Sequence, residues 1–185
     1  MSSIYDLIAA RQSDRGYDAS RKVEREKIDR IIEAGRLAPS ACNSQPWHFV
    51  VVDEPDKCHE VADSLASMGM NKFAYEAPCF IVVVQESPNF TARLGGWIKN
   101  KHFPLIDCGI ATSNITLAAT EEGLGSCILG WFDEKRLKKT LGIPSSKRVL
   151  LVVALGYSSQ NHREKSRKTT EEIASYNQYW NEQNC

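Results

Sequence analysis

The sequence lacks the features that would place a protein in a membrane, on nucleic acid or in a secretory pathway. Its 23 basic and 23 acidic side chains balance, so no global field attracts nucleic acid or anionic lipid. Its longest apolar runs, such as residues 79–84 and 149–155, have the length of strands and fall far short of the ~20 residues of a membrane span. The N-terminus has neither the basic start nor the uninterrupted apolar stretch of a secretory signal. We therefore expect a cytoplasmic protein with no nucleic-acid or membrane partner.

Paired cysteines and the common enzyme signatures are missing as well. The six cysteines form no C-x-x-C pair and have no histidine at metal-ligand spacing, so the sequence predicts reduced, mostly buried thiols and no metal site. No G-x-S-x-G, Walker A or H-E-x-x-H motif occurs. Gly123-Leu124-Gly125 has Ile128 where a dinucleotide-binding fingerprint requires a third glycine. The four histidines have no carboxylate or nucleophile at a fixed offset, so nothing indicates triad chemistry.

The composition is that of a packed globular protein. Apolar residues make up 42% of the chain and charged residues 25%, which argues against disorder, collagen and coiled coil. A length of 185 residues is enough for one substantial core and too short for two full domains. We therefore expect a single domain that spans residues 1–185.

The hydrophobic pattern predicts alternating helices and strands. Helices are expected from Ser3 to about Arg11, over 24–37, 56–68 and 107–122, after the cap Asp133 up to Gly142, and within 169–180. Buried strands are expected over 48–53, 79–85, 126–132 and 148–157. This order predicts the α/β (α+β) class, as a sandwich of helices around a single sheet.

Two of these segments are unusual for a compact monomer. The helix over 107–122, with Asp107 as its expected cap, carries almost no charge before its last residues, so we expect most of its faces to be buried and a partner subunit could cover one of them. The polar stretch after Ser158 and the short aromatic helix that follows it have no obvious place in the core. We expect this tail to pack across a surface or onto a partner chain.

Basic side chains alternate in two segments that are far apart in the sequence. Arg11, Ser13 and Arg15 lie at i, i+2 and i+4, so an extended backbone directs all three to one side, where they could bind one phosphate. Lys165 and Arg167 repeat this spacing. Each segment taken alone is also compatible with an ordinary solvated surface, but a third polar segment makes a shared binding site the stronger interpretation.

That third segment is the turn from Ala38 to Phe49, in which amides and hydroxyls stand between two prolines. Local side chain to backbone bonds at a helix end would explain its Ser and Asn residues. They explain less well why Gln45 and Trp47 follow directly before a buried strand. A hydrogen-bonding turn of this kind suits a planar heterocycle with donors and acceptors on its edge.

Together these segments resemble the FMN-dependent nitroreductase family. The motifs that carry the resemblance are R-x-S-x-R-x-Y at 11–17, P-S-A-C-N-S-Q-P-W-H-F at 39–49, G-L-G-S-C-I-L-G-W-F-D at 123–133, and K-S-R at 165–167 before T-T-E-E-I. The match runs in order from about Ile4 to Trp180. It implies a three-layer sandwich with a mostly antiparallel central sheet, and an obligate homodimer that holds FMN at the subunit interface, with the C-terminal tail reaching the partner.

The resemblance also implies roles for individual residues. Arg11, Ser13, Lys165 and Arg167 match positions that hold the FMN phosphate, and Arg15 matches a basic position near N1 and the C2 carbonyl of the flavin ring. Pro39, Ser40 and Asn43 match positions that the second subunit contributes, and Gln45 in the same turn is a further cofactor-binding candidate. Asn71 is a candidate for the flavin edge, and Leu129 and Gly130 match a turn that approaches the flavin near N5 and O4.

Two departures from larger relatives bear on the substrate side of the site. Leu129 stands where many of them carry an acidic residue, which puts side-chain gating by a carboxylate in doubt. The region from Ser87 to Phe103 is short, so we expect a small lid, for which the candidates are Trp97, Lys101, His102 and Phe103. Ordinary loop packing is the alternative for these four residues.

The implied activity is hydride transfer from NAD(P)H to flavin N5, followed by reduction of a nitroaromatic or quinone-type acceptor in the same cleft, which is a ping-pong mechanism. The flavin carries this chemistry, so no catalytic side chain is required. Two alternatives remain open. One is another flavin reaction, such as enone reduction, oxidation or dehalogenation, and the other is a flavin-binding sensor without turnover.

Overall fold

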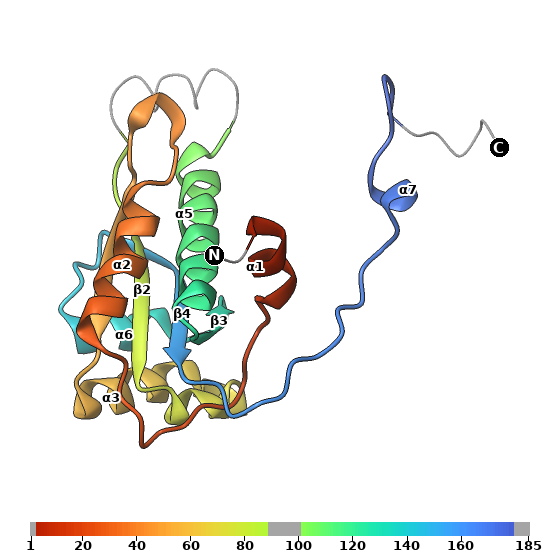
Figure 1. Cartoon of the computed structure of the whole chain (residues 1–185). Coiled ribbons are helices and arrows are strands. Elements are labelled where there is room, and N and C mark those ends of the chain that lie inside the picture. The colour runs from red at the N-terminus through yellow and green to blue at the C-terminus, as the bar shows by residue number, and fades with distance from the viewer. Residues whose placement is uncertain (1–2, 89–100, 180–185) are drawn as a thin grey trace.

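The computed structural model of the chain describes residues 3–88 and 101–179. Its helices are α1 (Ile4–Ala10), α2 (Arg25–Arg36), α3 (Pro55–Leu65), α5 (Phe103–Glu121), α6 (Glu134–Leu141) and α7 (Thr170–Ile173). Its strands are β1 (Trp47–Val52), β2 (Cys79–Gln85), β3 (Gly125–Leu129) and β4 (Arg148–Gly156). This is the predicted order of elements (Figure 1).

The four strands form one antiparallel sheet in the order β1-β2-β4-β3. β2 contains a run of β-branched and aromatic residues from Phe80 to Val84. It is buried over six of its seven positions because it lies inside the sheet, with helices on both faces. The predicted mixed fold class with a central antiparallel sheet is confirmed.

Two apolar clusters fill the spaces on either side of the sheet. On one face, Ile28 and Ile31 of α2 and Ile115 of α5 pack against Ile81 and other inward residues of the strands. On the other face, residues of α3 and α6 pack against a second set of strand residues, which includes Phe80, Val82 and Val152. The alternation of side chains along each strand produces the two clusters, so the molecule has three layers.

The predicted helix ends follow local capping chemistry. Ser3 and Asp6 form a reciprocal capping box, with Asp6 N–H donating to Ser3 Oγ over 3.1 Å and Ser3 N–H donating to Asp6 Oδ2 over 2.9 Å. Asp133 accepts from the backbone of Arg136 at the start of α6, and Gly142 ends that helix at φ 65°. These ends were predictable because the groups that satisfy them lie within four residues.

Four element boundaries differ from the prediction by three or more residues. The aromatic helix expected over 169–180 is reduced to Thr170–Ile173, so Tyr176 and Tyr179 lie beyond its end. α5 begins four residues before Asp107, with Pro104 in its first turn, so Asp107 is no cap but lies inside the helix and accepts a hydrogen bond from Ala41 N–H over 3.2 Å. β3 ends at Leu129, and α3 ends at Leu65. β1 is half-buried, in contrast to the expected buried strand, because it forms an edge of the sheet.

α5 is buried along one side and exposes an apolar side. Cys108, Ala111, Ile115 and Ala119 are inaccessible to solvent, as expected for a helix with so little charge. Leu105, Ile106 and Ile110 nevertheless remain exposed in the single chain. Nearby on α1, Ile4, Tyr5 and Ile8 are exposed as well. Helices α1 and α5 therefore share an uncovered apolar surface, which we call the α1–α5 face.

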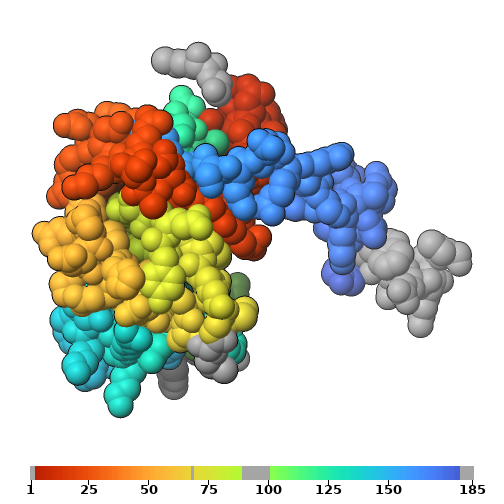
Figure 2. Space-filling view, turned by 90° about the horizontal axis from the view of Figure 1, so that it is seen from below, coloured from red at the N-terminus to blue at the C-terminus, as the bar shows by residue number. Residues whose placement is uncertain are grey.

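The C-terminal tail leaves the body of the molecule. After β4 it passes beside the red N-terminal segment and then projects outward, with α7 at a distance from the sheet (Figures 1 and 2). Ile173, Tyr176 and Tyr179 are 70–92% exposed. The expectation that the tail packs on a partner remains a prediction, because a single chain cannot test it.

The described cysteines agree with the expected mostly buried thiols. Cys58, Cys79, Cys108 and Cys127 are buried free thiols and Cys42 is exposed, whereas Cys185 lies outside the described residues. Burial raises the pKa of Cys58 and of Cys108 to about 11, so both stay protonated near neutrality. Among residues 3–88 and 101–179, no helix combines the length and apolar character needed to cross a membrane.

Gly156, at the end of β4, provides a test of packing between the sheet and the N-terminal segment. A Cβ there would lie 2.6 Å from Cδ of Pro78 and 3.0 Å from Cδ1 of Tyr17, and both neighbours are ring atoms that cannot rotate away. We expect Gly156→Ala to lower the free energy of unfolding by about 1–3 kcal/mol in denaturant titration. Gly16→Ala is the control, because its added Cβ meets the exposed side chains of Ser159 and Gln160, which can move. Equal stability of the Gly156→Ala variant and the wild type would contradict the expected clash.

Candidate functional site

Two segments from opposite ends of the chain lie side by side. We call residues 11–17 the N-terminal basic segment and residues 158–167 the C-terminal basic segment. Tyr17 and Ser158 form an antiparallel bridge, and Ser159 N–H donates to the Gly16 carbonyl over 3.2 Å. Ser13 forms a parallel bridge with Ser126 of β3. The end of the sheet therefore holds both basic segments at one place.

The two segments together line a cavity of about 300 Å³, which we call the cationic pocket. Its lining residues are Arg11, Gln12, Ser13, Arg15, Arg163, Glu164, Lys165, Ser166 and Arg167. All five residues predicted from the alternating pattern, Arg11, Ser13, Arg15, Lys165 and Arg167, are thus brought together although about 150 positions separate the two segments. Asp14, which stands between Ser13 and Arg15, is buried and does not line the pocket.

The positive charges of the pocket have no matching carboxylates. Among the described residues, none of its five cationic side chains forms an ion pair, and Glu164 on the same wall pairs with none of them. Lys165 donates to the Ile8 carbonyl and Arg163 donates to the Ser13 carbonyl over 2.7 Å. Burial, followed by the charges of Arg11 and Arg167, lowers the pKa of Lys165. An anion with several acceptor oxygens would relieve this repulsion.

Arg163 belongs to the pocket although the sequence interpretation did not name it. Its backbone N–H donates to Gln12 Oε1 over 3.0 Å, which fixes the start of the C-terminal basic segment against the N-terminal one. The signal was present, because Arg163, Lys165 and Arg167 continue the same i, i+2, i+4 spacing as Arg11, Ser13 and Arg15.

A second and larger hollow of about 720 Å³ adjoins the cationic pocket. The two share Arg11, Lys165 and Arg167. The rest of this hollow belongs mainly to the α1–α5 face and β3, with Ile8, Gly109, Leu117 and Ile128 among its lining residues. Charge at one end and apolar surface along the rest suit a ligand with a phosphate and an apolar body.

The turn before β1 is built tightly but lies outside both cavities. Ser40 Oγ accepts from Gln45 N–H over 2.9 Å, and Gln45 Nε2 donates to Asn43 Oδ1 over 3.1 Å. Cys42, Asn43 and Gln45 all have a positive φ, which is a strained conformation for residues other than glycine. Neither Pro39 nor these candidates lines the cationic pocket or the adjoining hollow of the same chain. A contribution from a second subunit remains a prediction.

The other cofactor candidates flank the end of β3. Asn71 adopts the left-handed conformation, and its amide donates to the carbonyls of Leu65 and Trp131 over 3.3 and 3.0 Å. Its amide nitrogen therefore holds the turn after β3. The Leu129 side chain is buried in the core, whereas Gly130 is exposed at the end of the strand. The Leu129 side chain itself supplies no polar group to a ligand.

The lid candidates are separated from the cationic pocket. Trp97 lies outside the described residues. Lys101 and His102 are exposed just before α5, and Phe103 begins that helix. None of the three lines the cationic pocket.

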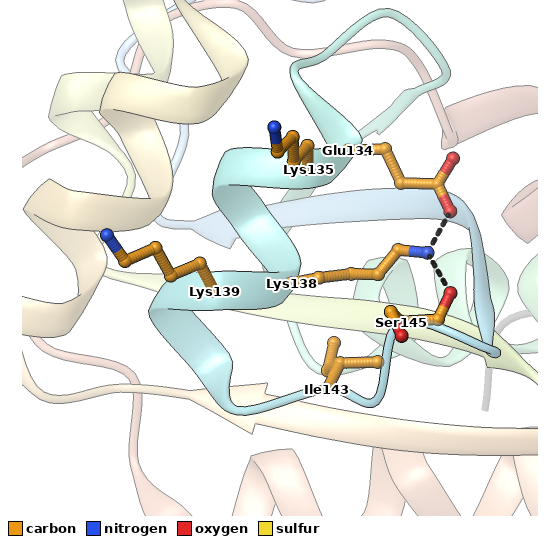
Figure 3. Close-up of a pocket in the computed structure, with 6 residues that line it drawn as sticks. All are labelled: Glu134, Lys135, Lys138, Lys139, Ile143 and Ser145. Atoms are coloured by element: carbon orange, nitrogen blue, oxygen red, sulfur yellow. Dashed lines mark hydrogen bonds and ion pairs between the residues drawn. The ribbon is translucent and has the colours of Figure 1, made fainter.

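A further hollow of about 450 Å³ lies beside α6, but its basic groups do not converge. Lys138 donates to Glu134 Oε1 and to the Ser145 carbonyl, each over 3.2 Å, so its charge is already paired. Lys135 and Lys139 project to other sides of the helix (Figure 3). The hollow therefore lacks the concentrated positive charge of the cationic pocket.

Comparison with known proteins gives one consistent result. The family model described as Nitroreductase family matches residues 8–69 and 62–157. A provisionally named NADH dehydrogenase/NAD(P)H nitroreductase of Archaeoglobus fulgidus is 34% identical over 161 residues, which cover 85% of this chain and 86% of the relative. The oxygen-insensitive NADPH nitroreductase of Helicobacter acinonychis is 28% identical, with 88% of this chain and 90% of the relative covered.

A solved structure agrees with the sequence comparisons. The chain superimposes on the FMN-dependent nitroreductase of Clostridium difficile R20291 with a TM-score of 0.73 and 28% identity, covering 94% of this chain and 98% of that one. The similarity thus extends over nearly the full length of both proteins.

The repulsion within the cationic pocket can be tested through the Lys165 ammonium. We expect Arg11→Ala to raise the pKa of Lys165, because a neighbouring guanidinium favours the neutral amine and its removal favours the protonated form. The rise should be partial, since burial is the larger cause of the lowered pKa. NMR titration of the lysine side-chain signals measures it. Arg30→Ala, which removes an arginine paired with Glu122, should leave the Lys165 pKa unchanged. An unchanged pKa in the Arg11→Ala variant would show that the two charges do not interact.

Proposed function

The chain belongs to the nitroreductase family, and from this premise we propose that it is an FMN-dependent oxidoreductase that uses NAD(P)H. The observation that carries the proposal is the cationic pocket, in which five positive side chains from the two ends of the chain surround one cavity. None of the five forms an ion pair with another residue of the described part of the chain. A phosphate is the anion that this donor set fits best, because arginine side chains offer planar pairs of N–H groups to its oxygens. The choice of NAD(P)H as the reductant rests on the names of the relatives given above.

The residues of the pocket fit the phosphate of FMN. Arg11, Ser13, Lys165 and Arg167 would hold the phosphate, with Arg163 added to the set. Arg15 is exposed at the rim, where its guanidinium would face N1 and the C2 carbonyl of the flavin ring. A fixed cation there stabilises negative charge that develops on the ring, which is an electrostatic contribution made by the chain itself.

When bound, FMN would supply N5 as the atom that takes hydride from NAD(P)H and passes it to a nitroaromatic or quinone-type small-molecule acceptor in alternating half-reactions. The chain would bind and orient the reactants and exclude water from the cleft. Leu129 gives no carboxylate for proton transfer near Gly130, so the proposal assigns no catalytic side chain there.

We further propose that the working form is a homodimer. Ile4, Tyr5 and Ile8 of α1 and Leu105, Ile106 and Ile110 of α5 are each at least 37% exposed, and large exposed apolar patches of this kind are typical of subunit interfaces. A second subunit that covers the α1–α5 face would also bring its own turn, with Pro39, Ser40, Asn43 and Gln45, toward the flavin.

The visible spectrum of the purified protein tests the function. We expect a flavin spectrum that bleaches when NADH or NADPH is added without oxygen, and that returns when a quinone or nitroaromatic is added. A flavin spectrum that neither reductant bleaches would favour the sensor alternative. A colourless protein that does not take up added FMN would contradict the proposal.

Variants of the cationic pocket test whether its arginines bind FMN. Arg11→Ala combined with Arg15→Ala should weaken FMN binding by about 100-fold or more, because each charge-assisted hydrogen bond contributes about 1.5–3 kcal/mol. Thermal unfolding without FMN should change little, since exposed charges add little to stability. The matched control is Arg25→Ala with Arg36→Ala, which removes two exposed arginines from α2. Tightly bound flavin in the first double variant would exclude the assigned roles.

The dimer has its own test. Ile106→Glu places a carboxylate on the α1–α5 face, where burial against a partner would leave the charge unpaired, so we expect monomers in sedimentation velocity together with weaker FMN binding. Lys139→Glu, an exposed position on the opposite layer, should leave the dimer intact. An unchanged dimer in the Ile106→Glu variant would place the interface elsewhere.

A further inference from the structure

Asp14 lies between the two halves of the cationic pocket without lining it. Its side chain is only 4% exposed, and Oδ1 accepts from Gln12 Nε2 over 2.9 Å and from Ser158 Oγ over 2.7 Å. Its backbone N–H donates to the Ser126 carbonyl of β3 over 2.9 Å. A buried carboxylate is costly unless such bonds satisfy it, so the position of Asp14 is strongly specified.

Gln12 connects Asp14 to Arg163, the cation of the pocket that the sequence analysis did not name. Its Nε2 also donates to the Asn161 carbonyl over 3.3 Å, and its Oε1 accepts from the backbone N–H of Arg163. Arg163 in turn donates to the Ser13 carbonyl. Side chains of the N-terminal basic segment thus hold the C-terminal basic segment from Ser158 to Arg163.

Gly125, the first residue of β3, leaves room for the Asp14 carboxylate because it has no side chain. A Cβ on Gly125 would lie 2.8 Å from Asp14 Oδ2 and 3.0 Å from Cβ of Ser158. Any side chain at this position would displace Asp14 or Ser158. The first residue of β3 therefore provides the space in which the two segments meet.

We propose that Gln12, Asp14 and Ser158 form a clasp that positions the cations of the pocket for a phosphate group. Asp14 is a positioning residue, because it does not line the pocket and acts through Gln12 and Ser158. Its charge would repel a phosphate, so any gain in affinity that it brings must come from geometry. The proposal rests on the proposed function, since it concerns the same pocket.

Comparison of FMN with riboflavin isolates the effect of the clasp, because riboflavin lacks the phosphate. Binding of each is measured by flavin fluorescence. We expect Asp14→Ala to weaken FMN binding by about tenfold, the size expected for loss of a charge-assisted hydrogen bond, while riboflavin binding changes by less than about twofold. Ser158→Ala, at an exposed position that will not endanger folding, should shift FMN binding in the same direction by about threefold.

Asp14→Asn separates the geometry of the clasp from its charge. An asparagine Oδ1 can accept both hydrogen bonds, so FMN affinity should equal or exceed that of the wild type once the repelling charge is gone. Asp18→Ala is the matched control. Asp18 is a nearby aspartate that does not line the pocket, and its carboxylate accepts hydrogen bonds from Ser20 N–H and Ser20 Oγ. The Asp18→Ala variant should bind both ligands as the wild type does.

Three results would overturn the clasp. They are wild-type FMN affinity in Asp14→Ala and Ser158→Ala, equal loss of FMN and riboflavin binding in Asp14→Ala, and an Asp14→Asn variant as weak as Asp14→Ala. Failure of the proposed function would give a different result. If the wild-type protein bound FMN no better than riboflavin, the pocket would not be a phosphate site, and the proposed clasp would be contradicted as well.

Discussion

The pairing of the N-terminal and C-terminal basic segments at the end of the sheet is the constraint on which the rest of the site depends. The two segments are joined by backbone pairing of Gly16 and Tyr17 with Ser158 and Ser159. This pairing brings together residues about 140 positions apart. Bringing together residues so far apart costs conformational entropy. Folding of the sheet offsets this cost, because β3 and β4 hold the chain next to the two segments. The pocket therefore exists only in the folded chain.

The second constraint is electrostatic. Like charges around one cavity repel one another. Burial lowers the pKa of Lys165, and the charges of Arg11 and Arg167 lower it further. A site of this kind gives up some stability of the free protein, and a bound anion restores it. Of the four segments that resemble the nitroreductases, those at 11–17 and 165–167 contribute residues to the pocket, whereas those at 39–49 and 123–133 do not line it.

Local chemistry made most of the fold predictable from the sequence. The capping box at Ser3, the Asp133 to Gly142 helix and the β-branched run of β2 are all determined within a few residues. The features that were predicted wrongly depend on contacts between residues far apart in the sequence. The edge position of β1 depends on strand order, and Asp107 bonds with Ala41, 66 positions away. In the site, alternation identified four of the five cations, and Arg163 was missed although it continues the same spacing. Asp14 was not found either, because its partner Ser158 is brought near only by folding.

The bridge between Ser13 and Ser126 has a consequence for solubility. β3 is the last strand of the sheet, and an open strand edge can pair with the edge of another molecule and start aggregation. The N-terminal basic segment occupies the outer side of β3 at this bridge. Loss of that segment, by proteolysis or by a mutation that detaches it, would uncover the edge as well as dismantle the pocket. The stretch of chain that we propose to bind the phosphate thus also covers the sheet edge at this bridge.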